Sequence, residues 1–161
     1  MAGIDLPDFS NIETENLKDM ILRHEKQGIT NTLRYRAAVE EIAKRQSKNL
    51  SPDITLTHLM DCAKRGEFTT YKRVAEANGA DWAKVHWQVA PHLDSILQIC
   101  HARNLPLFTA ICVTEPEVKT GNLDGTSLAG FIKGVRRLGR SVTSEETFLK
   151  ETQKACFEWR N

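Results

Sequence analysis

Residues 66–79 read GEFTTYKRVAEANG, and this stretch decides the predicted architecture. It predicts a turn, a short extended segment and then a helix that begins at Thr69 or Thr70. Lys72 and Arg73 fall in the first turn of that helix. Short basic helices of this kind are typical of winged-helix and helix-turn-helix modules, which present them to a DNA backbone or groove. The stretch therefore predicts nucleic-acid binding.

Composition places the chain among ordinary folded proteins. Its 161 residues suffice for one domain with a substantial core, with 40% hydrophobic and 27% charged residues. The formal net charge is +1, so nucleic-acid contact would have to come from local clustering of basic residues. No apolar run is long enough to span a bilayer, which predicts a protein that does not enter a membrane.

The N-terminal sequence and the cysteines predict the same cellular location. The first residues, MAGIDLPDFSNIE, lack the basic and apolar regions of a secretion signal, so a cytoplasmic protein is expected. A chain of this kind has little need of disulfides, and free thiols favour buried positions. We therefore expect four buried free cysteines: Cys62, Cys100, Cys112 and Cys156.

An N-terminal helical hairpin is predicted over residues 14–48. Leu17, Met20 and Ile21 recur at helical spacing, and Gly28 is well placed to end the first helix. A second, more charged helix is expected over residues 32–47. We predict a division into a hairpin unit, residues 1–50, packed on or extending the core, and a main domain, residues 51–161.

The start of the main domain carries helix signals. Ser51 followed by Pro52 is typical of a helix start, with serine as the cap and proline at the first helical position. Asp81 can cap a later helix, which Pro91 is expected to interrupt or kink. A strongly amphipathic helix should follow Pro91.

Residues 107–113, LFTAICV, change the character of the chain. They are rich in β-formers and bounded by prolines, which predicts a buried strand. A strand needs partners, and residues 67–69 and 117–119 are the available candidates. The predicted class is therefore α+β, mainly α, with a winged-helix-like centre that contains a small β-sheet. The N-terminal helical hairpin precedes this centre in the sequence.

The C-terminal part is predicted to hold two helices. One is expected around residues 127–137, and the last begins with a capping box of Thr143 and Glu146. Lys133, Arg136 and Arg137 share one helical face, and Arg140 follows closely.

These basic residues allow two interpretations. Together with Tyr71, Lys72 and Arg73 they could form a phosphate-binding surface. They could equally be a solvated face balanced by carboxylates. Trp82 and Trp87 favour core positions, although one exposed indole near Lys84 could stack on a base.

Catalytic and cofactor signatures are weak. The histidines lack the close pairing of a zinc site, and no phosphate-cradling glycine motif occurs, so neither metal nor cofactor is predicted. Glu115, Glu117 and Lys119 resemble a permissive strand-borne nuclease motif, which leaves a Mg²⁺-dependent nuclease as a minor alternative. A non-enzymatic role is the main prediction.

Two resemblances support this interpretation. The string GEFTTYKRVA resembles the winged-helix DNA-binding domain of alkylguanine-DNA alkyltransferases and alkyltransferase-like proteins, in which the tyrosine matched by Tyr71 lies at the DNA contact. The family's P-C-H-R active-site motif and its R-A-V-G segment are absent, so the resemblance implies a binding scaffold without alkyl transfer. The TYxxVA string, HARNLPLFTAICVT and the final F-E-W also resemble small bacterial modules found with restriction-type endonucleases and mobile elements. That likeness implies a role near DNA or in genome defence.

The leading prediction is a non-enzymatic protein that binds nucleic acid, with double-stranded DNA as the expected partner. The alternative is a protein–protein interaction module, either an accessory or inhibitor subunit or a homo-oligomer, that uses residues 14–48. An apolar patch on the hairpin together with dispersed basic residues would favour the alternative. A single basic face around Tyr71 would favour DNA.

Overall fold

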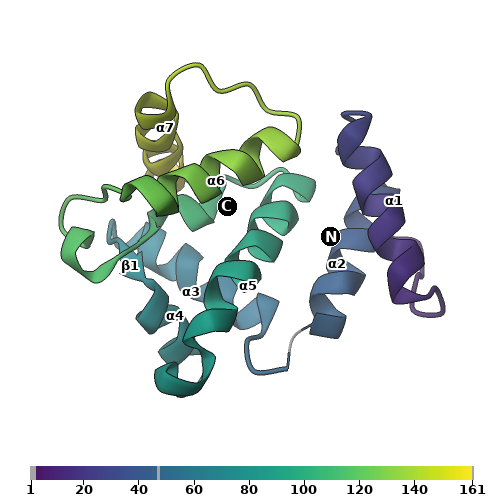
Figure 1. The fold of residues 1–161 in the computed structure, drawn as a ribbon, viewed down its shortest axis with the longest axis horizontal. Helices are drawn as coiled ribbons and strands as arrows, with labels where there is room; N and C mark the ends of the chain where they lie inside the picture. Colours follow the sequence, from purple (N-terminus) through teal and green to yellow (C-terminus); the bar gives the residue numbers. More distant parts are fainter. Residues whose placement is uncertain (1–2, 47, 161) are drawn as a thin grey trace.

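The structure, a computed structural model, describes residues 3–46 and 48–160. That part contains seven α-helices and one two-stranded sheet, which confirms the mainly helical α+β class (Figure 1). No helix in the described ranges has both the length and the apolar character that crossing a bilayer requires.

The predicted N-terminal hairpin is present as α1 (Thr14–Lys26) and α2 (Leu33–Gln46). Residue 47, the expected end of the second helix, lies outside the described residues. The two helices lie side by side at one edge of the molecule, and α2 packs against α5 (Trp82–Ala102). One hydrophobic cluster includes both Phe9, which precedes the hairpin, and Cys156 in the last helix, so both predicted units contribute to a common core.

The central helices begin at the predicted caps. Ser51 caps α3 (Pro52–Lys64), where the amide of Ile54 donates to its hydroxyl over 3.4 Å. Thr70, rather than Thr69, caps α4 (Tyr71–Ala77). Asp81 caps α5 as expected.

Pro91 does not interrupt its helix. The α5 helix continues through it over 21 residues. Pro91 is exposed, while Val89 and Leu93 on either side of it are buried. The helix therefore loses one backbone hydrogen bond at a surface position. Burial of this long apolar face outweighs the local loss of one hydrogen bond.

The predicted strand over residues 107–113 is mostly wrong. The segment forms a 3₁₀ turn, η1 (Phe108–Ile111), and only β2 (Cys112–Val113) is extended. β2 pairs in parallel with β1 (Thr69–Thr70), which overlaps the candidate partner at residues 67–69 only at Thr69. The buried carbonyl of Ala110 accepts a 2.9 Å hydrogen bond from Gln153, so a helix side chain replaces a strand neighbour.

The chain after β2 differs from prediction in two further places. Residues 117–119 are not a strand, because η2 (Glu115–Glu117) turns the backbone there. After α6 (Gly125–Arg137), helix α7 (Glu145–Glu158) is capped by Ser144 rather than Thr143. The amide of Thr147 donates to the Ser144 hydroxyl over 3.4 Å. The predicted buried free thiols are confirmed at all four positions: Cys62, Cys100, Cys112 and Cys156.

Candidate functional site

Helices α4 and α5 form a helix–turn–helix that packs on α3. A four-residue turn, residues 78–81, joins them, and α3, α4 and α5 contact one another. Asn78 fixes this arrangement, because its Oδ1 accepts from the Ser51 amide over 2.7 Å and its Nδ2 donates to Thr55 Oγ1 over 2.9 Å. Thr55 in turn lies 2.7 Å from Nε2 of His92 on α5, so polar contacts connect all three helices.

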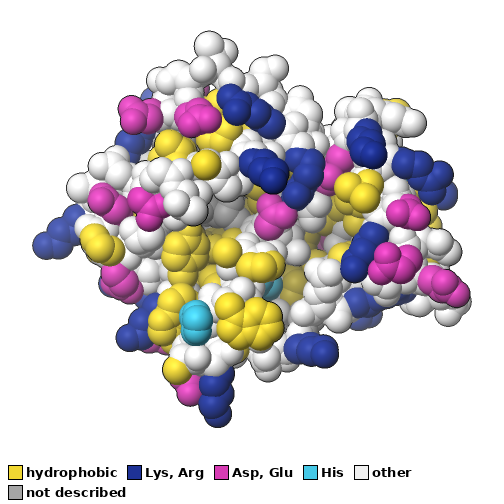
Figure 2. Space-filling model, viewed as in Figure 1, with side chains coloured by type: hydrophobic (Ala, Val, Ile, Leu, Met, Phe, Trp, Pro, Cys, Tyr) yellow, Lys and Arg dark blue, Asp and Glu magenta, His cyan; other side chains and the backbone are white. Residues whose placement is uncertain are grey.

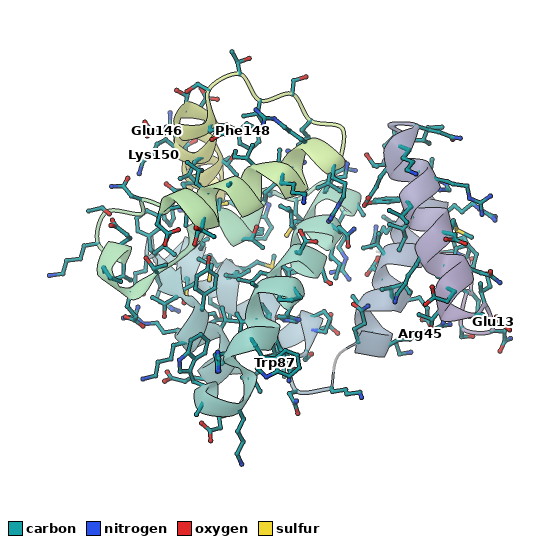
Figure 3. All side chains as sticks on the ribbon, in the orientation of Figure 1. Glu13, Arg45, Trp87, Glu146, Phe148 and Lys150 are labelled. Atoms are coloured by element: carbon teal, nitrogen blue, oxygen red, sulfur yellow. The ribbon has the colours of Figure 1, made fainter. Side chains whose placement is uncertain are left out.

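The predicted contact residues on α4 are available at the surface. Lys72 and Arg73 are exposed, and neither forms an ion pair or a side-chain hydrogen bond within the described chain. Lys84, in the first turn of α5, is also exposed and shows no ion pair among the described residues. Trp87 is 68% exposed and projects from the N-terminal half of α5 (Figure 3). The expected core position for this indole is therefore wrong.

The basic residues of α6 are separated from those of α4. Figure 1 places α4 beside the lower, N-terminal half of α5, and the C-terminal end of α6 near the upper, C-terminal end of α5. Lys133 is exposed, whereas Arg136 lies 3.7 Å from Glu145 and donates to the Val142 carbonyl over 3.3 Å. The predicted basic residues do not form one continuous stripe.

Arg137 connects α6 to the hairpin and to α5. Its Nη2 lies 2.7 Å from Asp94, and its Nε lies 3.3 Å from Glu25. The Glu25 side chain is only 3% exposed, and it also accepts hydrogen bonds from Tyr35 and Gln98. Arg137 therefore neutralises a buried carboxylate.

Arg140 is likewise part of an internal network. Its Nε donates to Nδ1 of His101 over 3.0 Å, and Nε2 of His101 lies 2.7 Å from Thr30 Oγ1. The Thr30 hydroxyl donates to the Leu138 carbonyl, so Nε2 of His101 must carry the proton. Burial, assisted by the Arg140 charge, lowers the pKa of His101 to about 4 and keeps the ring neutral.

A mostly apolar cavity of about 450 Å³ opens between α5 and α6. Figure 2 shows hydrophobic side chains around a hollow in the middle of this face. Its walls come from α5, α6, the start of α4 and the 107–113 segment. The lining includes four aromatic side chains and no lysine or arginine: Tyr71, Trp82, His86 and Phe131 are the aromatic members.

Two polar groups of the cavity wall stand out. Thr109 is 8% exposed, and its hydroxyl is the one buried side-chain oxygen in the described chain without a hydrogen-bond partner. Tyr71, predicted to contact DNA, is half-buried and lines the cavity. Burial raises the pKa of the Tyr71 phenol, and a hydrogen bond with Ser127 offsets part of this increase.

The acidic pair does not have the geometry of a strand-borne nuclease. Glu115 and Glu117 lie in a 3₁₀ turn, and each accepts a hydrogen bond from a threonine, Thr70 at 2.9 Å and Thr120 at 2.6 Å. In the described ranges, no three His, Cys, Asp or Glu side chains are grouped so as to hold a metal ion.

The cavity was not predicted from sequence. The apolar spacing of α5 predicts a buried face. That spacing is the same whether the face packs against other side chains or lines a cavity. The available signal is the pair Gly130 and Gly134 on α6. A Cβ at Gly134 would come within 2.7 Å of Leu97, whereas one at Gly130 would meet nothing within 4 Å. At Gly134, α6 packs closely against α5, whereas at Gly130, one turn earlier, there is open space beside the helix.

Comparisons with protein-family models, curated proteins and solved structures found no match to this chain.

Proposed function

We propose that the protein binds double-stranded DNA through the helix–turn–helix of α4 and α5. The observation that carries the proposal is the presence of exposed, unpaired Lys72 and Arg73 on α4, next to the turn that leads into α5. In helix-turn-helix modules the second helix enters the major groove while the first crosses the backbone. Lys72 and Arg73 then contact phosphates, and Lys84 and Trp87 lie on the helix that approaches the groove.

The contact set is smaller than the sequence alone indicated. Arg137 and Arg140 are assigned to the fold, because their donors already bind Glu25, Asp94 and His101. Tyr71 is assigned to the cavity wall. With a net charge of +1, a small basic contact set implies modest affinity with a clear salt dependence.

A salt series of fluorescence anisotropy with short duplex DNA tests this proposal. Replacing Lys72 and Arg73 by alanine removes two phosphate contacts, which should reduce the slope of log affinity against log salt by about 1.8. The double variant Arg23→Ala, Lys26→Ala also removes one arginine and one lysine, from exposed positions on α1, and serves as the matched control. Equal slopes for the two double variants, or no binding by the unaltered protein at low salt, would refute the assignment.

A second candidate function is protein–protein interaction through the hairpin. Three of the large exposed hydrophobic side chains lie there, at Leu22 (49%), Ile29 (42%) and Leu33 (48%). The separation of the α4 and α6 basic groups also fits this candidate.

Self-association through the hairpin can be measured by sedimentation velocity over a range of protein concentrations. Leu22→Ser combined with Leu33→Ser should shift an oligomer toward monomer. Ile54→Ser, at a side chain 47% exposed on α3, should leave the distribution unchanged. A concentration-independent monomer in the unaltered protein would remove the homo-oligomer from consideration.

A further inference from the structure

We propose that the cavity between α5 and α6 binds a small, neutral, mainly aromatic molecule that carries one hydrogen-bonding group. This binding is independent of DNA. The volume of the cavity, about 450 Å³, lies within the range of small-molecule sites, which are mostly apolar with a few polar groups that fix orientation.

The walls select for aromatic character. Tyr71, Trp82, His86 and Phe131 all line the cavity, and the rings of Trp82 and His86 lie 5.8 Å apart at a tilted angle. Flat rings on several sides favour an occupant that can stack or meet their edges.

The charges of the wall select for a neutral occupant. Among the described residues, no lysine or arginine lines the cavity, so an anion would lack a partner. Asp94 is the one carboxylate in the lining, and it already pairs with Arg137 at 2.7 Å. Burying a charged group here without a partner would be unfavourable.

Thr109 supplies the polar anchor. Its side chain is more than nine-tenths buried, and its hydroxyl lacks any partner in the described chain. Rotation about its Cα–Cβ bond moves the hydroxyl among three staggered positions, which lets it turn toward an occupant. An unpaired buried hydroxyl is unfavourable, so a ligand that pairs with it gains affinity.

N-phenyl-1-naphthylamine, a neutral aromatic dye whose fluorescence rises in apolar surroundings, is the probe for the cavity. The dye should bind the unaltered 161-residue protein saturably, at one site. Gly130→Leu should abolish binding, because Gly130 shares a helical face with Ser127 and Gly134 and has open space before it. Gly125→Leu makes the same change on the same helix outside the cavity lining and should bind the dye normally.

One further variant keeps the test decisive. Ala90→Leu blocks the cavity from α5 and should also abolish binding if Gly130→Leu proves poorly folded by circular dichroism. Non-saturable dye fluorescence in the unaltered protein overturns the proposal. Unchanged binding in a folded blocking variant overturns it as well.

Competition with indole and indene tests the role of Thr109. The two molecules share a shape, but only indole has an N–H donor. Indole should displace the dye at concentrations about three- to tenfold lower than indene. Thr109→Val, a substitution of equal shape, should remove that difference while leaving dye binding intact. A preference for indole that survives in Thr109→Val would overturn the assignment of the hydroxyl.

Discussion

Replacing Arg137 by alanine should destabilise the fold and leave DNA binding by the folded protein unchanged. The substitution leaves Glu25, whose side chain is 3% exposed, without the guanidinium 3.3 Å away. Removing one partner of a fully buried ion pair costs about 3–5 kcal/mol. Here Tyr35 and Gln98 still donate to Glu25, and the vacated space adjoins solvent because Arg137 is 37% exposed.

These two features reduce the expected loss to about 2–3 kcal/mol of unfolding free energy. At about 2–4 °C per kcal/mol for a domain of this size, the melting temperature should fall by about 4–12 °C. Urea unfolding followed by circular dichroism gives the free energy directly. Lys133→Ala, which removes an exposed cation from the same helix, should change stability by less than about 0.5 kcal/mol.

A double variant isolates the buried charge as the cause. Glu25→Gln keeps an oxygen that accepts from Tyr35 and Gln98 but has no charge to neutralise. The combination with Arg137→Ala should therefore be more stable than Arg137→Ala alone. An Arg137→Ala protein as stable as the Lys133→Ala control, with weaker DNA binding, would refute the reasoning and return Arg137 to the phosphate contacts.

Two further predictions concern the fold. Gly121→Ala should cost about 2–5 kcal/mol of stability, because its φ is +74° and the new Cβ would lie 2.1 Å from the Phe68 ring. Gly79→Ala is the control: its φ is +69° but a Cβ there would meet nothing within 4 Å, so the loss should be only about 1–2 kcal/mol. Equal losses in urea unfolding would show that the Phe68 contact contributes nothing. Burial lowers the pKa values of His92 and His101 to about 4 in the folded protein. As pH falls, these histidines are protonated in the unfolded chain before they are protonated in the folded protein. The free energy of unfolding should therefore decrease as pH drops from about 6.5 to about 4. The loss should be about 1–2 kcal/mol for each partly exposed ring, and a flat unfolding free energy between pH 7 and pH 5 would contradict it.

Local sequence signals predicted the elements whose formation depends on their own residues. Ser51 and Asp81 cap the helices that they were expected to cap, because a cap needs only the side chain and amides within the next few residues. The apolar spacing of Leu17 and Ile21 likewise predicted the buried face of α1. The caps of α4 and α7, Thr70 and Ser144, differ from Thr69 and Thr143 by one position each, which is within the usual uncertainty of a helix boundary.

The sequence was less informative where a distant residue decides the outcome. An apolar run such as residues 107–113 does not reveal whether its carbonyls will meet a strand or a side chain, and Gln153 on α7 decides in favour of the latter. Arg137 looked like a surface cation because Glu25, its partner, lies more than a hundred positions earlier. Pairings of this kind depend on the packing of α1, α5 and α6, which no local pattern encodes.

The cavity and the helix–turn–helix meet at one residue. Tyr71 begins α4, immediately before Lys72 and Arg73, and its ring forms part of the cavity wall. The wall also keeps features that reduce stability: a glycine within α6 costs about 0.5–1 kcal/mol relative to alanine, and the unpaired Thr109 hydroxyl costs about 1–3 kcal/mol. A sequence that served the fold alone could fill this space with valine and leucine. Thr109, whose hydroxyl would anchor an aromatic occupant, and Tyr71, from which the basic helix starts, line the same cavity.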